Sequence, residues 1–150
     1  MNKQLIDPMT GGFRLSDSFA VDAATQLKDL NNYFGDDLKE SIYMKGCWYT
    51  VPKVKIAGLY FRFRFYFTAR RLKSIGFTID ETVAERDPWT GNHVFETQWI
   101  AAQMGDTSNF TWDLEQAGRH YHLARHWGSI GVYYDFKNGT FESLLRYRIE

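Results

Sequence analysis

The feature that most constrains the fold is a strict alternation of residue types over residues 59–67. The sequence there reads Leu-Tyr-Phe-Arg-Phe-Arg-Phe-Tyr-Phe, so every odd position carries Leu or Phe and every even position carries Tyr or Arg. Successive side chains of an extended strand point to opposite faces of a sheet, which gives a period of two. The pattern therefore predicts a strand with one buried face and one exposed face.

A second strand is predicted over residues 72–79, where Ile75, Phe77 and Ile79 continue the same parity. The two strands predict an antiparallel hairpin that closes near residues 68–71. No glycine lies in that turn, so the sequence leaves the turn type open. Residues 41–51 and 54–67 are rich in β-branched and aromatic side chains, which favours strands there as well.

The Asn138-Gly139 pair predicts a further hairpin near the end of the chain, because this dipeptide favours a two-residue type I′ turn. Such a turn fixes the register of the flanking strands and places their larger apolar side chains on one face. The predicted opposite pairs are Phe136 with Phe141, Tyr134 with Ser143, Val132 with Leu145, and Ile130 with Tyr147.

Two segments have the spacing of amphipathic helices. The first is predicted over about residues 23–34, with Asp22 or Thr25 as the capping residue and Gly35 at the end. The second is predicted over about residues 93–104 and ends at Gly105. Their apolar positions are Leu27, Leu30 and Phe34 in the first helix, and Val94, Phe95, Trp99 and Ile100 in the second.

The remaining segments complete the fold prediction. Residues 13–19 are expected to form a short strand, and residues 106–126 two strands around Gly118. Aromatic residues make up 17% of the chain, a bias that favours β-rich structure. We therefore expect an α+β fold in one domain, residues 1–150, with a mainly antiparallel sheet of about six or seven strands. Both helices are expected to pack on one face of that sheet.

Composition excludes several classes of protein. Lys and Arg number 18 and Asp and Glu number 18, so the formal net charge is zero and binding to nucleic acid or membranes through general basicity is disfavoured. The single cysteine, Cys47, rules out an internal disulfide framework and is expected to be buried and inert. The first residues lack a secretory signal, and no apolar run reaches the roughly 18 residues of a membrane helix, so a cytoplasmic location is expected.

The first candidate site is the exposed face of the predicted hairpin. Arginine pairs with carboxylates or phosphates, and tyrosine adds contact area at low entropic cost, so the face suits an acidic protein partner or a nucleic-acid backbone. The alternative is an ordinary solvated face, balanced by the acidic residues Asp80, Glu81, Glu85 and Asp87. The predicted partner-binding residues are Tyr60, Arg62, Arg64, Tyr66, Arg70 and Arg71.

Two weaker patterns concern metal binding and acid–base chemistry. His120 and His122 would share one side of a strand near His126, and Asp113 or Glu115 could complete a metal site. Carboxylates cluster at residues 36–40 and 80–81, which are expected to be polar loops. No phosphate-binding glycine motif and no nucleophile elbow occur, so no catalytic residue, metal or cofactor is expected.

Two stretches carry a resemblance to a known class of protein. The first runs from Gly58 through Phe67 and on to Leu72-Lys73-Ser74-Ile75. The second is Trp127-Gly128-Ser129-Ile130, followed by Tyr134-Asp135 and a terminal strand. Over about half the chain, this order is similar to small cytoplasmic bacterial immunity proteins encoded beside toxin genes of contact-dependent or type VI secretion systems.

The resemblance implies a protein that binds and neutralises a cognate toxin and performs no catalysis. Two alternatives remain open from the residues themselves. One is a small metal-binding protein or enzyme that uses His120, His122 and His126. The other is a structural module that self-associates through exposed aromatic side chains.

Overall fold

The computed structural model describes residues 3–80, 91–106, 119–135 and 140–148 of the chain. Within these ranges the main elements are two α-helices and ten strands, with one short 3₁₀ turn, η1, at Gly35–Asp37. In chain order they are β1 (Phe13–Ser16), β2 (Phe19–Val21), α1 (Leu27–Phe34), β3 (Lys39–Glu40), β4 (Trp48–Thr50), β5 (Val54–Ile56), β6 (Leu59–Thr68), β7 (Arg71–Asp80), α2 (Gly91–Met104), β8 (Arg119–Arg125), β9 (Gly128–Asp135) and β10 (Thr140–Tyr147).

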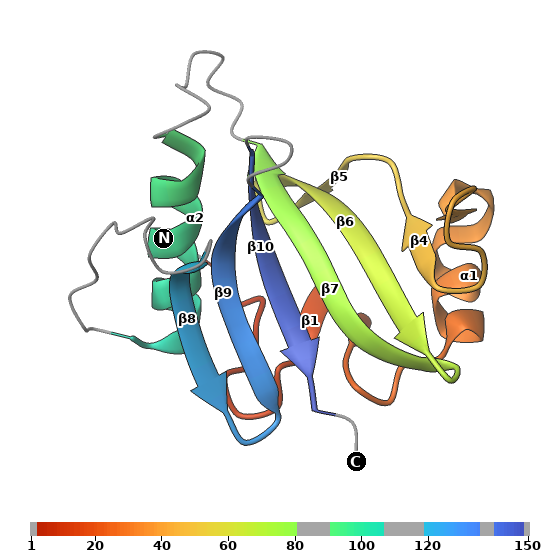
Figure 1. Ribbon diagram of the computed structural model, residues 1–150, viewed down its shortest axis with the longest axis horizontal. Coiled ribbons are helices and arrows are strands. Elements are labelled where there is room, and N and C mark those ends of the chain that lie inside the picture. Colours follow the sequence, from red (N-terminus) through yellow and green to blue (C-terminus); the bar gives the residue numbers. More distant parts are fainter. Residues whose placement is uncertain (1–2, 81–90, 107–118, 136–139, 149–150) are drawn as a thin grey trace.

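An eight-stranded sheet dominates the molecule (Figure 1). Its strand order is β3-β4-β6-β7-β10-β9-β8, and β5 pairs with β6 beside this path. All of the paired strands are antiparallel. The α+β prediction is confirmed, and the sheet exceeds the expected six or seven strands because short pieces such as β3 and β5 join it. β1 and β2 form a separate two-stranded sheet.

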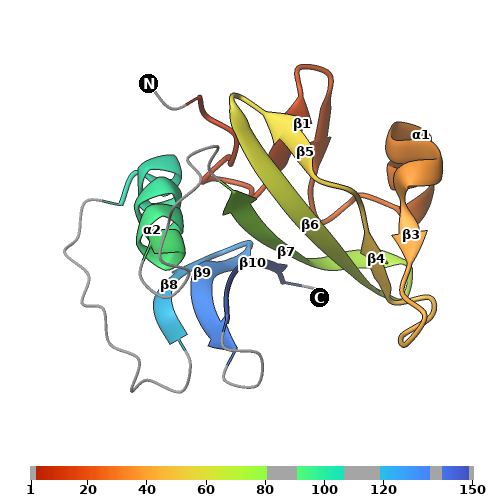
Figure 2. The same ribbon diagram turned by 90° about the horizontal axis from the view of Figure 1, so that it is seen from above.

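The helices and the β1–β2 hairpin lie on one side of the large sheet (Figure 2). The phenylalanines of β6 point to that side and are buried, as the alternation predicted. Phe13 of β1 contacts them edge-on, with its ring centroid 5.7 Å from that of Phe61 and 5.3 Å from that of Phe63. Trp99 of α2 and Phe34 of α1 pack on the same side, against Phe61 and Phe65. No described element covers the other face of the sheet.

Polar contacts from the far end of the chain hold the N-terminal segment on the core. Gln103, which is buried on α2, accepts hydrogen bonds through Oε1 from the backbone N–H groups of Leu5 (2.7 Å) and Ile6 (2.9 Å). Trp127 donates from Nε1 to the carbonyl of Pro8 at 2.9 Å. Buried backbone groups need such partners, so these side chains fix the path of the segment.

The central hairpin forms as predicted, with Tyr60 opposite Asp80 at one end and Thr68 opposite Arg71 at the other. Its turn consists of Ala69 and Arg70, whose φ angles are 50° and 68°. Left-handed φ at both positions is the requirement of a type I′ turn, which normally recruits Asn or Gly. The sequence left this turn type open because neither residue prefers that conformation.

The register of the C-terminal hairpin differs from the prediction by two residues. Asp135 lies opposite Thr140, and Val132 lies opposite Ser143 rather than Leu145. A slip of two residues leaves every side chain on its original face, so the apolar pattern could not distinguish the two registers. Asn138 and Gly139, on which the prediction rested, lie outside the described residues.

The helix predictions are correct in place, but both starts differ from the prediction. α2 begins at Gly91 rather than near residue 93, and the residue before the first turn of α1 is Gln26 rather than Asp22 or Thr25. α1 begins at Leu27 rather than near residue 23, because Gln26 and Asp29 form a capping box at its start. Its end at Gly35, where φ is 59°, was predicted. α2 ends before Gly105 as expected, and two members of its predicted apolar stripe, Trp99 and Ile100, are buried.

Three strand predictions need correction. Residues 13–19 form parts of two strands, β1 and β2, that pair with each other. Only Trp48–Thr50 of residues 41–51 is a strand, since residues 41–47 turn back and expose their apolar side chains to water. Of residues 106–126, β8 is a strand, while residues 107–118, with Gly118 among them, lie outside the described part of the chain.

Candidate functional site

The uncovered face of the sheet is built from the residues that alternate with the core. On β6 these are Tyr60, Arg62, Arg64 and Tyr66, which lie on one face as the sequence predicted. This face is turned toward the viewer in Figure 1, with the helices behind the sheet. The pairing adds Trp48, which lies opposite Tyr66. A polar and aromatic surface therefore covers the side of β6 that the phenylalanines leave free.

Arg64 is the centre of this surface. Its guanidinium makes a two-pronged ion pair with Glu142 of β10: Nε donates to Oε2 at 2.8 Å, and Nη2 donates to Oε1. The pair spans β7 at Gly76, where an added Cβ would lie 2.7 Å from Glu142 Oε2. The absence of a side chain at Gly76 therefore leaves the space in which these two side chains meet.

Aromatic side chains hold the arginine from its other side. The guanidinium carbon of Arg64 lies 4.9 Å from the centre of the Trp48 ring, within the range of a cation–π contact. Trp48 in turn packs on Tyr66, with ring centroids 4.7 Å apart. We call Arg64, Trp48, Tyr66 and Glu142 the arginine cluster. Its side chains are ordered by one another, although the side chain of Arg64 is 51% exposed.

An open depression of about 450 Å³ lies in the surface beside the arginine cluster. Two further basic side chains line it, Lys73 of β7 and Arg146 of β10, together with the apolar Leu144. Glu142 is the one acidic residue among its lining residues, and it is already paired with Arg64. The depression thus presents an excess of positive charge next to an aromatic wall.

Cations also surround the other aromatic residues of this face. Lys53 and Lys55 place their ammonium groups 5.7 and 5.6 Å from the centre of the Tyr60 ring. Arg146 lies over the ring of Tyr133 at 5.7 Å, and the hydroxyl of Tyr133 is 2.7 Å from His122 Nδ1. The face therefore repeats one arrangement, a basic side chain held against an aromatic ring.

The six predicted partner-binding residues fall into two groups. Tyr60, Arg62, Arg64 and Tyr66 share the uncovered face, whereas Arg70 lies in the hairpin turn and Arg71 begins β7 beside it. The sequence interpretation balanced this face with Asp80, Glu81, Glu85 and Asp87, and the structure adds an acid to that set. The acid that faces Arg64 is Glu142, which is 78 residues away in sequence and was not singled out. Of the proposed acidic stretch, residues 81–87 lie outside the described residues.

Sequence reasoning missed Trp48, Glu142 and Arg146. Trp48 had a usable signal, since it alternates with the buried Tyr49. Glu142 and Arg146 had no such signal. Their position near Arg64 depends on the pairing of β10 with β7, a strand that is far from β10 in sequence.

The weaker candidate sites fall only partly within the described residues, since Glu81, Asp113 and Glu115 lie outside them. His122 lies on the uncovered face, His126 follows β8 in an exposed turn, and the side chain of His120 lies outside the description. Within the described ranges, no three His, Cys, Asp or Glu side chains come together in a way that could hold a metal ion. Asp36 and Asp37 are exposed in η1. Cys47 is partly exposed rather than buried.

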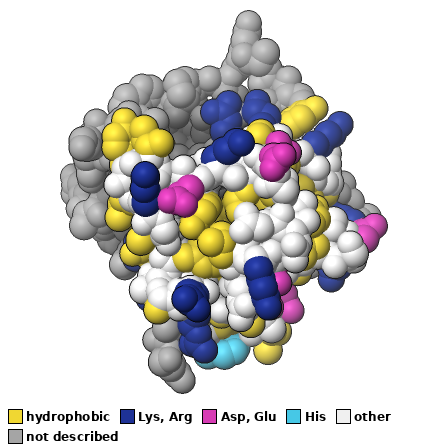
Figure 3. Space-filling view, turned by 90° about the vertical axis from the view of Figure 1, so that its right-hand side faces the viewer, with side chains coloured by type: hydrophobic (Ala, Val, Ile, Leu, Met, Phe, Trp, Pro, Cys, Tyr) yellow, Lys and Arg dark blue, Asp and Glu magenta, His cyan; other side chains and the backbone are white. Residues whose placement is uncertain are grey.

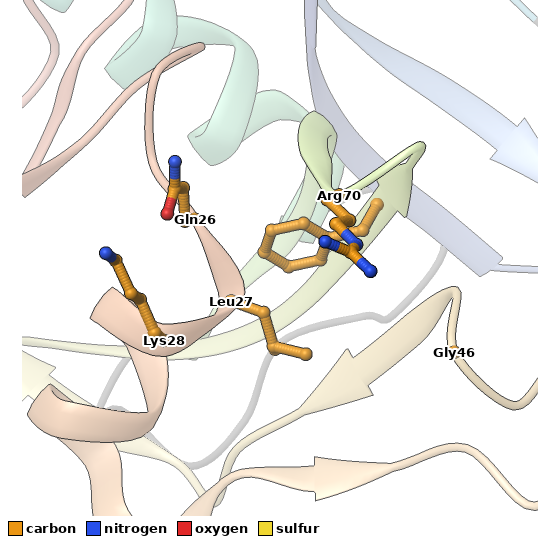
Figure 4. Close-up of a pocket in the computed structure, with 6 residues that line it drawn as sticks. Gln26, Leu27, Lys28, Gly46 and Arg70 are labelled. Carbon is orange, nitrogen blue, oxygen red and sulfur yellow. The ribbon is translucent and has the colours of Figure 1, made fainter.

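A second depression, of about 400 Å³, lies at the end of the molecule that carries α1. Gln26, Leu27 and Lys28 reach it from the start of α1, and Arg70 from the β6–β7 turn (Figure 4). Phe67 and Gly46 complete its lining. Its charged lining residues, Lys28 and Arg70, are both basic.

Comparison with known proteins gives one informative match. No protein-family profile matches the chain, and no curated protein sequence does. One chain of a solved structure described as "Rhs1-CT in complex with cognate immunity protein RhsI1" has a similar fold, with a TM-score of 0.56. The match covers 95% of this chain and 86% of that chain at 17% identity, so the likeness concerns the fold alone. Neither of the described helices has both the length and the apolar character needed to cross a membrane.

Proposed function

We propose that this protein is an immunity protein, which binds a cognate toxin protein and neutralises it without catalysis. The observation that carries the proposal is the arginine cluster, an ordered Arg–Trp–Tyr surface on a sheet face that no described element covers. The similarity of fold to a chain from a toxin–immunity complex supports it. The proposed site of action is the cytoplasm, and the proposed activity needs no cofactor.

The cluster has the physical properties of a binding hot spot. Trp, Tyr and Arg are the residue types most enriched among the side chains that carry protein–protein binding energy. Arg64 is already fixed between Trp48 and Glu142, so it loses little conformational freedom when a partner binds. A partner carboxylate could share the guanidinium, which has more N–H donors than Glu142 uses.

The surrounding charge indicates the chemistry of the partner surface. Arg62, Lys73 and Arg146 flank the cluster, while the whole chain has a net charge of zero. A local basic patch attracts an acidic patch and increases the association rate without attracting anions to the whole protein. We therefore propose that the toxin presents an acidic, partly apolar surface to this face.

The test uses the toxin domain that the proposal expects to be encoded beside this chain's gene. Co-expression of this protein with that domain is expected to restore growth of a host that the domain alone kills. Titration calorimetry of the purified proteins is expected to give a one-to-one complex. Arg64→Glu should weaken that complex by about 100-fold or more, as charge reversal in a desolvated hot spot costs several kcal/mol. Arg14→Glu, on the exposed part of β1, is the matched control and should bind as wild type.

Two results would overturn the proposal. One is the absence of both binding and protection by the wild-type protein. The other is toxicity of this chain when it is expressed alone, which would make it the toxic partner rather than the protective one. If the Arg64→Glu variant binds the toxin domain as tightly as the wild type, the interface lies outside the arginine cluster.

A further inference from the structure

The loop between β3 and β4 exposes three consecutive large apolar side chains. Ile42 is 74% exposed, Tyr43 88% and Met44 48%. Scattered exposed apolar residues are ordinary on protein surfaces, but a contiguous group of this kind marks an interaction site more often. The other large apolar residues that are exposed in the described part of the chain, Met9 and Tyr33, stand apart from this group in sequence.

The backbone of this loop is held in place while its side chains face water. The hydroxyl of Ser41 accepts hydrogen bonds from the N–H groups of Tyr43 (3.1 Å) and Met44 (3.3 Å). The loop closes where Ser41 N–H donates to the carbonyl of Trp48 at 2.9 Å. A loop ordered before binding gives up less entropy when its apolar side chains are buried by a partner.

The loop is continuous with the arginine cluster and with the basic hairpin end. It leads directly into Trp48, and the carbonyl of Cys47 accepts a hydrogen bond from Phe67 N–H at 2.8 Å. Three basic residues, Lys45 of the loop, Arg70 of the β6–β7 turn and Arg71 at the start of β7, are exposed here, and the exposed Glu40 of β3 adjoins the loop. This end of the molecule faces the viewer in Figure 3, where Lys and Arg side chains, with some Asp and Glu side chains among them, border apolar patches.

We infer that residues 41–47 form a docking tip that inserts Ile42, Tyr43 and Met44 into an apolar recess of the toxin protein. This inference rests on the proposed function and adds a second contact to the arginine cluster. The basic border of the tip indicates that carboxylates surround the recess. The tip contributes buried apolar area, which slows dissociation, whereas Lys45, Arg70 and Arg71 increase the rate of association.

The test compares a tip variant with a matched control on the same toxin domain. The tip variant carries Ile42→Ser, Tyr43→Ser and Met44→Ser together. The control, Met9→Ser, removes a side chain that is 68% exposed in a different turn. Surface plasmon resonance should show affinity reduced by roughly 30-fold or more for the tip variant, mainly through faster dissociation. The control should match wild type. The single variant Tyr43→Ser serves if the triple variant fails to fold.

The outcomes separate this inference from the proposed function. If the wild-type protein and the tip variant bind the toxin domain equally tightly, the docking-tip inference is wrong and the immunity proposal still stands. If the wild-type protein does not bind the toxin domain, both the proposed function and this inference are wrong. A wild-type dimer in sedimentation that the tip variant converts to monomer would assign the tip to self-association and would also overturn the inference.

Discussion

Tyr147 illustrates how single polar atoms secure the core at the residue scale. Its ring is fully buried near the end of β10, and its hydroxyl donates to the carbonyl of Gly11 at 2.7 Å. Burial, and secondarily the charge of Asp22, raises the pKa of Tyr147 well above its usual range. Neutral tyrosine is therefore the form that the folded protein needs.

This shift predicts a specific loss of stability in alkali. The unfolded chain releases the tyrosine proton first, at pH about 10, so the contribution of Tyr147 is complete below that pH and declines above it. The slope is up to about 1.4 kcal/mol per pH unit for one tyrosine. Tyr147→Phe should be less stable at pH 7, by about 1 kcal/mol for the lost hydrogen bond, and less sensitive to alkali. Urea unfolding at pH 7 and at pH 10–11 measures both effects, and equal slopes for the two proteins would contradict this account.

Gln103 gives a second prediction at this scale. Gln103→Ala leaves the buried N–H groups of Leu5 and Ile6 without their acceptor, which is expected to lower the free energy of unfolding by about 2–4 kcal/mol. Gln98→Ala, on the exposed side of the same helix, should change it by less than about 0.5 kcal/mol. Chemical denaturation of both variants provides the measurement. A similar small change in both would mean that water replaces the side chain of Gln103.

Two type I′ turns in the described part of the sheet give a prediction at the scale of elements. Ala69 and Arg70 join β6 to β7 with left-handed φ angles, and Ala57 and Gly58 join β5 to β6 in the same way. Left-handed backbone costs about 1–2 kcal/mol for a residue with a Cβ and much less for glycine or asparagine. Ala69→Asn with Arg70→Gly should therefore raise stability by about 1 kcal/mol, or about 3 °C in thermal unfolding.

The control is the opposite kind of substitution, glycine to alanine, in the β5–β6 turn. Gly58 has φ of 84° and nothing within 4 Å of an added Cβ, so Gly58→Ala introduces backbone strain without a clash. It should lower stability by about 1 kcal/mol. Opposite signs in differential scanning calorimetry support the assignment of strain, whereas a loss of stability in both variants would show that Arg70 contributes contacts in the folded state.

At the scale of elements, the faces of a strand follow from its own sequence pattern, whereas the register between two strands does not. The alternation in β6 correctly assigned Phe61, Phe63 and Phe65 to the core and Arg62 and Arg64 to the other face, because a period of two is a local property of a strand. The register of β9 and β10 could not be obtained in this way, since a two-residue slip leaves both faces unchanged.

At the scale of the whole molecule, the core joins the two ends of the chain. Ile6 and Phe13 belong to the same buried cluster as Ile130 and Leu145. We therefore predict that the chain unfolds as one cooperative unit, as the single domain expected from the sequence should. Tryptophan fluorescence and far-ultraviolet circular dichroism should give coincident urea transitions. An earlier fluorescence transition would contradict this by showing that one part of the core melts separately.

The sequence by itself determined the class of fold, the central hairpin, the two helices and the two faces of β6. These features rest on local periodicity and on residues such as Gly35 and Gly105 that end helices. Only the tertiary structure decided which residues complete the arginine cluster, because Glu142 reaches Arg64 across Gly76 through the pairing of β10 with β7. It also decided that Ile42, Tyr43 and Met44 face water rather than the core. Their apolar character predicts burial, but whether any element covers them depends on how distant segments pack, which a local pattern does not encode.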